Sequence, residues 1–188
     1  SWASQNLFMV RELEFSFQHY ETLSSTNDEA IDLAKNGEPE GMVITADFQL
    51  KGRGREGREW QSTRGQDLLL SILLRPLFKI NHIPGLTILG AEAVQETLAI
   101  YGIKSHIKRP NDVLVDGKKI CGILTESQSK GDHVDWCVLG LGLNVNSTAG
   151  DIPSEATSLH LLLNRHLDLG EVKETLLERF KEKYLSYD

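Results

Sequence analysis

Cysteine and long hydrophobic runs are both scarce in this sequence. The 188 residues include only 2 cysteines, Cys121 and Cys137, and these do not form a Cys-x-x-Cys pair. Two isolated cysteines exclude a disulfide framework, argue against a zinc site and are typical of reduced thiols in the cytoplasm. The longest apolar runs, such as residues 68–74, are far shorter than the roughly 20 residues of a membrane-spanning helix. We therefore expect a cytoplasmic protein that does not cross a membrane.

Basic residues are outnumbered by acidic ones. Lys and Arg total 20 against 27 for Asp and Glu, which gives a formal net charge of −7. This charge argues against general nucleic-acid binding, which depends on neutralising phosphates. The first residues lack the basic and apolar pattern of a secretion signal, so export is not expected. The length suits one domain over residues 1–188 with a sizeable core.

Hydrophobic periodicity and turn residues predict more strands than helices. Thr26 followed by Glu29 predicts a capping box at the start of a helix that Gly37 ends. Pro84 is expected to open a long helix that ends at Gly102. Because the strands mostly connect by hairpins, the pattern favours an α+β fold with a mixed, largely antiparallel sheet backed by helices. The expected strands cover residues 15–20, 41–46, 67–74, 105–108, 113–115, 118–126 and 133–145, and two further helices cover residues 157–164 and 170–184.

The segment 49–62 (QLKGRGREGREWQS) is basic and rich in glycine although the whole chain is acidic. Glycine and arginine alternate, so no apolar face exists at helical or strand spacing. Glycine backbone can bring N–H groups close to an oxyanion, and guanidinium groups bind one through two parallel hydrogen bonds. A disordered linker is the alternative, but Trp60 and the flanking strands favour a ligand-binding loop. Its cations are Lys51, Arg53, Arg55 and Arg58.

A β-hairpin is expected around Asp116-Gly117, a residue pair favoured in type I′ turns. Counting outward from this turn places Val115 opposite Lys118, Leu114 opposite Lys119 and Asp112 opposite Cys121.

This register predicts that Lys119 and Asp112 share one face as diagonal neighbours, about 7–8 Å apart. Cys121 and Ile123 are expected to be buried on that same face. A lysine beside a carboxylate suits an acidic phosphate substrate, and Asp112 could hold a hard metal ion. Lys118 is interpreted as an ordinary surface lysine.

Two further stretches have both a functional and a structural interpretation. Glycines 140 and 142, inside a predicted strand, mark either the close approach of a ligand or a bulge. Asn144 and Asn146 either bind a nucleotide or end that strand. Residues 24–27 (SSTN) cap a helix, whose N-terminus can also bind an anion such as a carboxylate.

Taken in order, these stretches resemble the catalytic domain of the biotin protein ligases. The resemblance spans about residues 20–185, and the combination of motifs is specific although each alone is weak. The matching elements are SSTN at 24–27, Q-x-x-GRGRxGRxW at 49–60, PND at 110–112, KKICGILTE at 118–126 and GLGLN at 140–144.

The resemblance implies a fold similar to the class II aminoacyl-tRNA synthetases and a two-step reaction. Biotin and MgATP would first form biotinyl-5′-adenylate and diphosphate, and a lysine of a biotin carboxyl carrier protein would then attack the adenylate and release AMP. The basic loop would fold over this intermediate, and a homodimer is one implied assembly.

The resemblance also implies roles for individual residues. Lys119, Arg53 and Arg55 would be catalytic, and Asp112 would bind Mg²⁺. Contacts with biotin or its activated carboxyl fall to Ser25, Thr26, Asn27, Gln49, Gly52, Arg53, Arg55 and Lys119. Contacts with ATP or the adenylate fall to Arg55, Arg58, Trp60, Asn111 and Asn144.

The sequence departs from the family pattern in three places. Arg109 stands where the family usually has tryptophan before Pro-Asn-Asp. No winged-helix segment precedes residue 1, so a repressor role is not expected. The sequence stops at Asp188, where the family usually continues into an SH3-like domain, and this domain is expected to be either absent or truncated. A lipoate or octanoyl ligase, a non-catalytic biotin or adenylate sensor and a nucleic-acid-binding module are the alternative functions.

Overall fold

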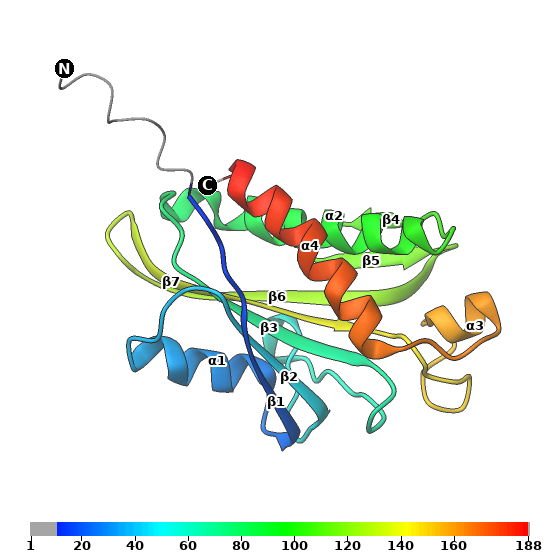
Figure 1. The fold of residues 1–188 in the computed structure, drawn as a ribbon. Coiled ribbons are helices and arrows are strands. Elements are labelled where there is room, and N and C mark those ends of the chain that lie inside the picture. The colour runs from blue at the N-terminus through cyan, green and yellow to red at the C-terminus, as the bar shows by residue number, and fades with distance from the viewer. Residues whose placement is uncertain (1–10, 188) are drawn as a thin grey trace.

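One seven-stranded sheet organises the molecule, with strand order β1-β2-β3-β7-β6-β5-β4. The computed structural model describes residues 11–187, so part of the predicted 1–188 domain lies outside the described residues. β1 is parallel to β2, and every other neighbouring pair is antiparallel. The predicted α+β fold is confirmed (Figure 1). The strands are β1 (Ser16–Leu23), β2 (Met42–Gln49), β3 (Leu68–Leu74), β4 (His106–Lys108), β5 (Asp112–Val115), β6 (Lys118–Lys130) and β7 (His133–Leu143).

Helices cover both faces of this sheet. α1 (Thr26–Lys35) lies on one face, whereas α2 (Ile83–Ile100) and α4 (Leu169–Tyr187) pack side by side on the other (Figure 1). The short α3 (Leu159–Leu163) precedes α4. Because β3 runs through the middle, all of its residues are buried, and this explains its unbroken apolar run. The larger core lies beneath α2 and α4, and a smaller one lies beneath α1.

The start of α1 differs by one residue from the sequence prediction. Ser25, not Thr26, is the N-cap: its backbone is extended and its side chain accepts a hydrogen bond from Asp28 N at 3.0 Å. Thr26 is already helical, and its hydroxyl bonds instead to Gln49 on β2 and Ser71 on β3. Both hydroxyl residues satisfy local capping rules, so only these contacts with distant strands decided between them.

The predicted hairpin register is wrong beyond its first two pairs. Asp116 and Gly117 both have positive φ, as a type I′ turn requires. A bulge between Val113 and Leu114 then shifts the register, so Asp112 pairs with Gly122 and not with Cys121. A bulge places one extra residue in one strand and exchanges the faces that follow it.

The bulge determines which residues lie on the same face of the sheet as Lys119. Its side chain shares a face with Gly122, close enough that a Cβ there would lie 3.2 Å from Nζ. Cys121 and Ile123 are buried as expected, but in the core beneath α2 and α4. The face that carries Lys119 is therefore floored by glycine, which leaves room for a ligand.

Both cysteines are free and buried. Burial raises the pKa of both thiols, that of Cys137 to about 12, so they are unreactive structural residues. In the part of the chain between residues 11 and 187, no helix is long and apolar enough to cross a membrane.

Candidate active site

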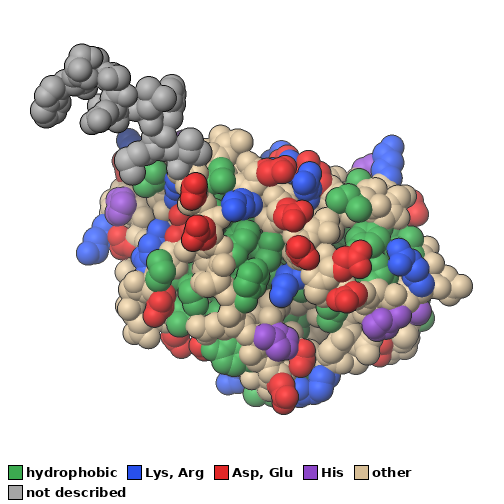
Figure 2. Space-filling model, in the orientation of Figure 1, with side chains coloured by type: hydrophobic (Ala, Val, Ile, Leu, Met, Phe, Trp, Pro, Cys, Tyr) green, Lys and Arg blue, Asp and Glu red, His purple; other side chains and the backbone are tan. Residues whose placement is uncertain are grey.

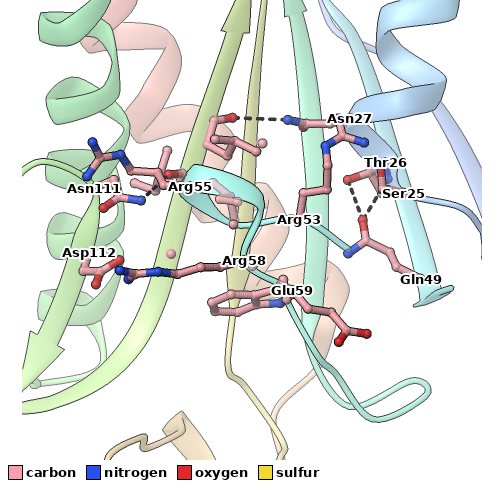
Figure 3. Close-up of a pocket in the computed structure, with 18 of the residues that line it drawn as sticks. Ser25, Thr26, Asn27, Gln49, Arg53, Arg55, Arg58, Glu59, Asn111 and Asp112 are labelled. Carbon is pink, nitrogen blue, oxygen red and sulfur yellow. Dashed lines mark hydrogen bonds between the residues drawn. The ribbon is translucent and has the colours of Figure 1, made fainter. Parts of the chain in front are cut away.

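A cavity of about 160 Å³ lies on the α1 face of the sheet, between the glycine-rich loop, the start of α1 and strands β6 and β7 (Figure 3). Its floor includes Leu124 and the glycines Gly122, Gly140 and Gly142. The structure thereby brings together stretches that are far apart in the sequence. The predicted site residues that line the cavity are Ser25, Thr26, Asn27, Gln49, Arg53, Arg55, Arg58, Trp60, Asn111, Asp112 and Lys119.

Two glycines that face each other on neighbouring strands support the indole of Trp60. Gly122 on β6 pairs with Gly142 on β7, and a Cβ added at Gly142 would lie 2.5 Å from Trp60 Nε1. At Gly142 the close neighbour is therefore the indole of this chain, whereas the sequence analysis expected a ligand or a bulge there. Trp60 Nε1 is buried against this strand and has no hydrogen-bond partner among the described residues.

The end of the cavity beside α1 is polar and rigidly hydrogen-bonded. Gln49 Oε1 accepts hydrogen bonds from Thr26 N at 2.8 Å and Thr26 Oγ1 at 3.2 Å. Asn27 Oδ1 accepts one from Ser71 Oγ at 2.5 Å. Ser71 was missed by the sequence analysis, although a single polar residue inside the run LLLSILL was the available signal. Fixed amides and hydroxyls suit recognition of a polar ring system.

Arg53 is held by two carboxylates, neither of which the sequence analysis identified. Its guanidinium donates to Asp28 Oδ1 on α1 and to Glu126 Oε1 on β6, the latter at 2.6 Å. Asn27 Nδ2 donates to the same Glu126 oxygen at 2.9 Å. The loop is thus attached to both walls of the cavity, and the positive charge of Arg53 already faces two carboxylates.

These ion pairs also affect protonation. Burial raises the pKa of Asp28, but hydrogen bonds from Arg53 and Ser24 outweigh burial and hold the pKa below its ordinary value. The carboxylate and the guanidinium therefore remain charged at neutral pH, and the attachment of the loop persists there.

The glycine-rich loop is hydrogen-bonded to itself. Trp60 N donates to Gly52 O at 2.8 Å, and Gly54 N donates to Arg58 O at 2.6 Å. A Cβ on Gly52 would lie 2.5 Å from Trp60 O. Gly52 is not among the cavity-lining residues. Position 52 requires glycine because two backbone segments cross there and leave no room for a side chain. Because its backbone is paired and its arginine is held, the loop has the character of a binding element and not of a free linker.

Lys119 and Asp112 meet beneath the indole. Lys119 Nζ lies 3.0 Å from Asp112 Oδ1 and 5.1 Å from the centroid of the Trp60 ring. The ammonium is within ion-pair distance of Asp112 Oδ1, but this buried oxygen accepts no well-aligned hydrogen bond from the described residues. Lys119 N donates to Glu155 O, and Thr157 N donates to Lys119 O, each at 2.9 Å. This backbone pairing fixes the position of the lysine.

Arg55 and Arg58 are exposed, and their charges are largely uncompensated. Arg55 has no carboxylate partner between residues 11 and 187, and Arg58 has only Glu56 at 3.9 Å. In Figure 3 their side chains extend towards Asn111 and Asp112 respectively. Unlike Arg53, they can bind an incoming polyanion.

Asn144 is not among the residues that line this cavity, and its expected nucleotide contact stays a prediction. Its buried side chain donates to Thr157 O at 3.1 Å, and its backbone N donates to Ile120 O. Asn146 similarly holds Leu167 through two hydrogen bonds. Both asparagines therefore support loops, and Asn144 supports the one that pairs with Lys119.

The residues present suit a metal held mainly by substrate. Within residues 11–187, no cluster of three or more His, Cys, Asp or Glu side chains could hold a metal ion alone. Asp112 does offer one buried carboxylate oxygen in the cavity. This fits Mg²⁺, which often uses one carboxylate together with phosphate oxygens and water.

Comparison with known proteins finds relatives along most of this chain. Residues 19–144 match the Biotin/lipoate A/B protein ligase family. The chain is 40% identical over 174 residues to the bifunctional ligase/repressor BirA of Bacillus subtilis, covering 90% of this chain and 54% of that protein. It is 34% identical over 154 residues to a biotin–[acetyl-CoA-carboxylase] ligase of Mycobacterium tuberculosis, covering 78% of this chain and 53% of that protein. The chain thus spans about half the length of these curated relatives.

A solved structure shows the same fold. The biotin protein ligase from Aquifex aeolicus in complex with biotin and ATP superposes with a TM-score of 0.78 and 33% identity, covering 91% of this chain and 70% of that chain. The motifs that line the cavity lie within or next to the matched segment, on the fold that this relative shares. The chain therefore belongs to the biotin/lipoate A/B protein ligase family.

Proposed function

We propose that this protein activates biotin as biotinyl-5′-adenylate and transfers it to a lysine of a biotin carboxyl carrier protein. One observation carries the proposal: a polar recognition end at α1 and a cationic end at Lys119 meet in one cavity beneath Trp60. Such a cavity suits a ligand with a polar ring at one end and a carboxylate at the other. The biotin protein ligases among the relatives support the choice of biotin.

In the first step a carboxylate oxygen of biotin would form a bond to the α-phosphorus of ATP. The bond between that phosphorus and the oxygen bridging to the β-phosphate breaks, and this oxygen leaves with the electron pair as part of diphosphate. Two anions must be brought together, so catalysis depends on positioning and electrostatics. Lys119, Arg55 and Arg58 supply positive charge, and Mg²⁺ beside Asp112 would neutralise further phosphate charge when bound.

We assign Arg53 a positioning role and not direct contact with the biotin carboxylate. Its guanidinium is already bonded to Asp28 and Glu126, and moving it would leave two carboxylates without their shared cation. By holding the loop against α1 and β6, it keeps Trp60 over the ligand and water away from the reactive anhydride.

In the second step the lysine amine of the carrier would attack the acyl carbon of the adenylate. A carbon–nitrogen bond forms, the bond from that carbon to the AMP oxygen breaks with its electron pair leaving on AMP, and the proton that the attacking amine gives up passes to water. We place this reaction in the cytoplasm, because ATP is available there and both cysteines are free thiols.

Lipoate activation is the second candidate, because the matched family includes lipoate ligases. Offering biotin and lipoate separately in an ATP–diphosphate exchange assay separates the two. Exchange that depends on lipoate alone would contradict our assignment.

The direct test incubates the protein with biotin, MgATP and a carrier domain, and then measures the mass of the carrier. We expect an increase equal to one biotinyl group, absent without ATP. Tight biotin binding without exchange or transfer would show a biotin sensor and refute the proposed enzyme.

A further inference from the structure

A second cavity, of about 360 Å³, adjoins the first. The two share Arg55, Asn111, Ile123 and Leu124. The second cavity lies at the edge of β6, where pairing with β5 stops at Gly122, and the start of α2 closes its far side. Its other lining residues are Ile83, Pro84, Gly85, Thr87, Ile88, Arg109, Pro110 and Thr125.

The charges around this side cavity are all positive. Arg55 and Arg109 line it, and no aspartate or glutamate does, although the chain has a net charge of −7. Neither arginine has a carboxylate partner in the described part of the chain. On the α4 face, acidic and basic side chains are interspersed (Figure 2), and the groove between β1 and α4 contains both signs. Two uncompensated arginines around one cavity therefore indicate an anion.

The side cavity also offers a neutral hydrogen-bond donor. Thr87 Oγ1 and Thr125 Oγ1 lie 2.8 Å apart. When one hydroxyl donates to the other, the hydrogen of the accepting hydroxyl remains free for a third partner. The cavity can therefore bind an anion by charge and by hydrogen bonding.

The position of this cavity matches the direction in which diphosphate would leave. Phosphoryl transfer requires the attacking and leaving oxygens to lie roughly in line with the phosphorus. In Figure 3 the recognition end, with Thr26 and Gln49, lies on one side of the main cavity, and Arg55 and Asn111 lie on the other. A carboxylate that arrives from the α1 side would expel its leaving group towards the side cavity.

We propose that Arg55 and Arg109 bind the β- and γ-phosphates of ATP and the diphosphate that they become. This inference rests on the proposed function, because it assigns one substrate group to a subsite of the same centre. Arg109 makes the subsite a property of this chain, since the family pattern usually places a tryptophan there. A planar guanidinium can bind two phosphate oxygens at once, which a tryptophan cannot do.

The test is calorimetric titration with inorganic diphosphate, and separately with AMP, of the wild-type protein and of Arg109→Gln, Arg109→Lys and Lys108→Gln. Lys108→Gln is the matched control, because it removes one neighbouring positive charge outside the cavity. We expect Arg109→Gln to weaken diphosphate binding by about tenfold, the loss of one charge-assisted interaction. Arg109→Lys should retain part of the affinity, and AMP binding should be unchanged throughout.

Two kinds of result would overturn the subsite. The first is that the wild-type protein does not bind diphosphate. The second is that Arg109→Gln shows no specific effect, because it weakens diphosphate binding no more than Lys108→Gln does or weakens AMP binding equally. The proposed function is tested separately by biotin-dependent ATP–diphosphate exchange with the wild-type protein. Failure of exchange refutes biotin activation, whereas the comparison of variants decides the diphosphate subsite.

Discussion

Replacing Gly142 by alanine should remove Trp60 from its place over the active-site floor. The added Cβ would lie 2.5 Å from Trp60 Nε1 and 2.7 Å from Cζ2. Ordinary contact requires about 3.5 Å, so one partner must move by about 1 Å. Gly142 is paired with both Leu69 and Gly122 in the middle of the sheet. The strand is therefore held on both sides, and the indole must move.

The cost follows from this geometry. Overpacking of this kind costs typically about 1–3 kcal/mol. If the cost falls on the position of the indole and not on the fold, biotin should bind about 5- to 150-fold more weakly. Gly150→Ala is the matched control, because the nearest atom to its added Cβ is Thr148 Oγ1 at 4.0 Å.

Calorimetric titration with biotin measures the effect on ligand binding, and thermal unfolding measures the effect on the stability of the fold. We expect Gly142→Ala to lose affinity while its unfolding temperature stays close to that of the wild type, and Gly150→Ala to change neither. Biotin affinity within twofold of the wild type in a folded Gly142→Ala protein would refute the view that the indole above this glycine forms part of the ligand site.

Three further predictions concern charged residues. Lys119→Ala should slow adenylate formation by about 10²–10³-fold, the usual effect of removing one group that stabilises transition-state charge, whereas the exposed Lys118→Ala should not; equal rates in single-turnover assays would disprove the assignment. Glu126→Gln should lower the free energy of unfolding by about 1 kcal/mol in urea titrations, because Arg53 loses a charged acceptor, and should speed the loss of adenylate from the protein; unchanged adenylate retention would contradict the proposed attachment of the loop. The pKa of Asp28 is lowered in the folded state. Its ion pair should therefore stabilise the fold above the ordinary pKa of 3.8, and this stabilisation should disappear as the pH falls through the lower folded-state pKa. The free energy of unfolding of Asp28→Asn should fall less steeply over this acidic range, and parallel stability–pH curves for the variant and the wild type would exclude this contribution.

Local patterns in the sequence were sufficient for the fold class and for the glycine-rich loop. Alternating apolar residues indicate a half-buried strand, and an unbroken apolar run indicates a fully buried one. Both patterns can be recognised from residues that are neighbours in the sequence. The Asp116-Gly117 turn was predictable for the same reason, since positive φ at both residues is a local preference. Local rules were not sufficient at the cap of α1, where Ser25 and Thr26 both satisfy them.

Most partners within the site could not be found from local patterns. Arg53 bonds to Asp28, 25 residues away, and to Glu126, 73 residues away, and these contacts are the basis of the positioning role that we propose for it. The bulge in the hairpin changed the residues that share a face with Lys119, because one extra residue reverses the alternation of side chains.

The sequence by itself determined the order of the motifs, the cations of the glycine-rich loop and the turn at Asp116-Gly117. Only the tertiary structure decided which cations are already neutralised and which are available. Arg53 is enclosed by two carboxylates, whereas Arg55 and Arg109 face a cavity without any. The reason is that the interaction energy of two charges depends on the distance between them. That distance is set by the sheet, which brings segments together that are far apart in the sequence.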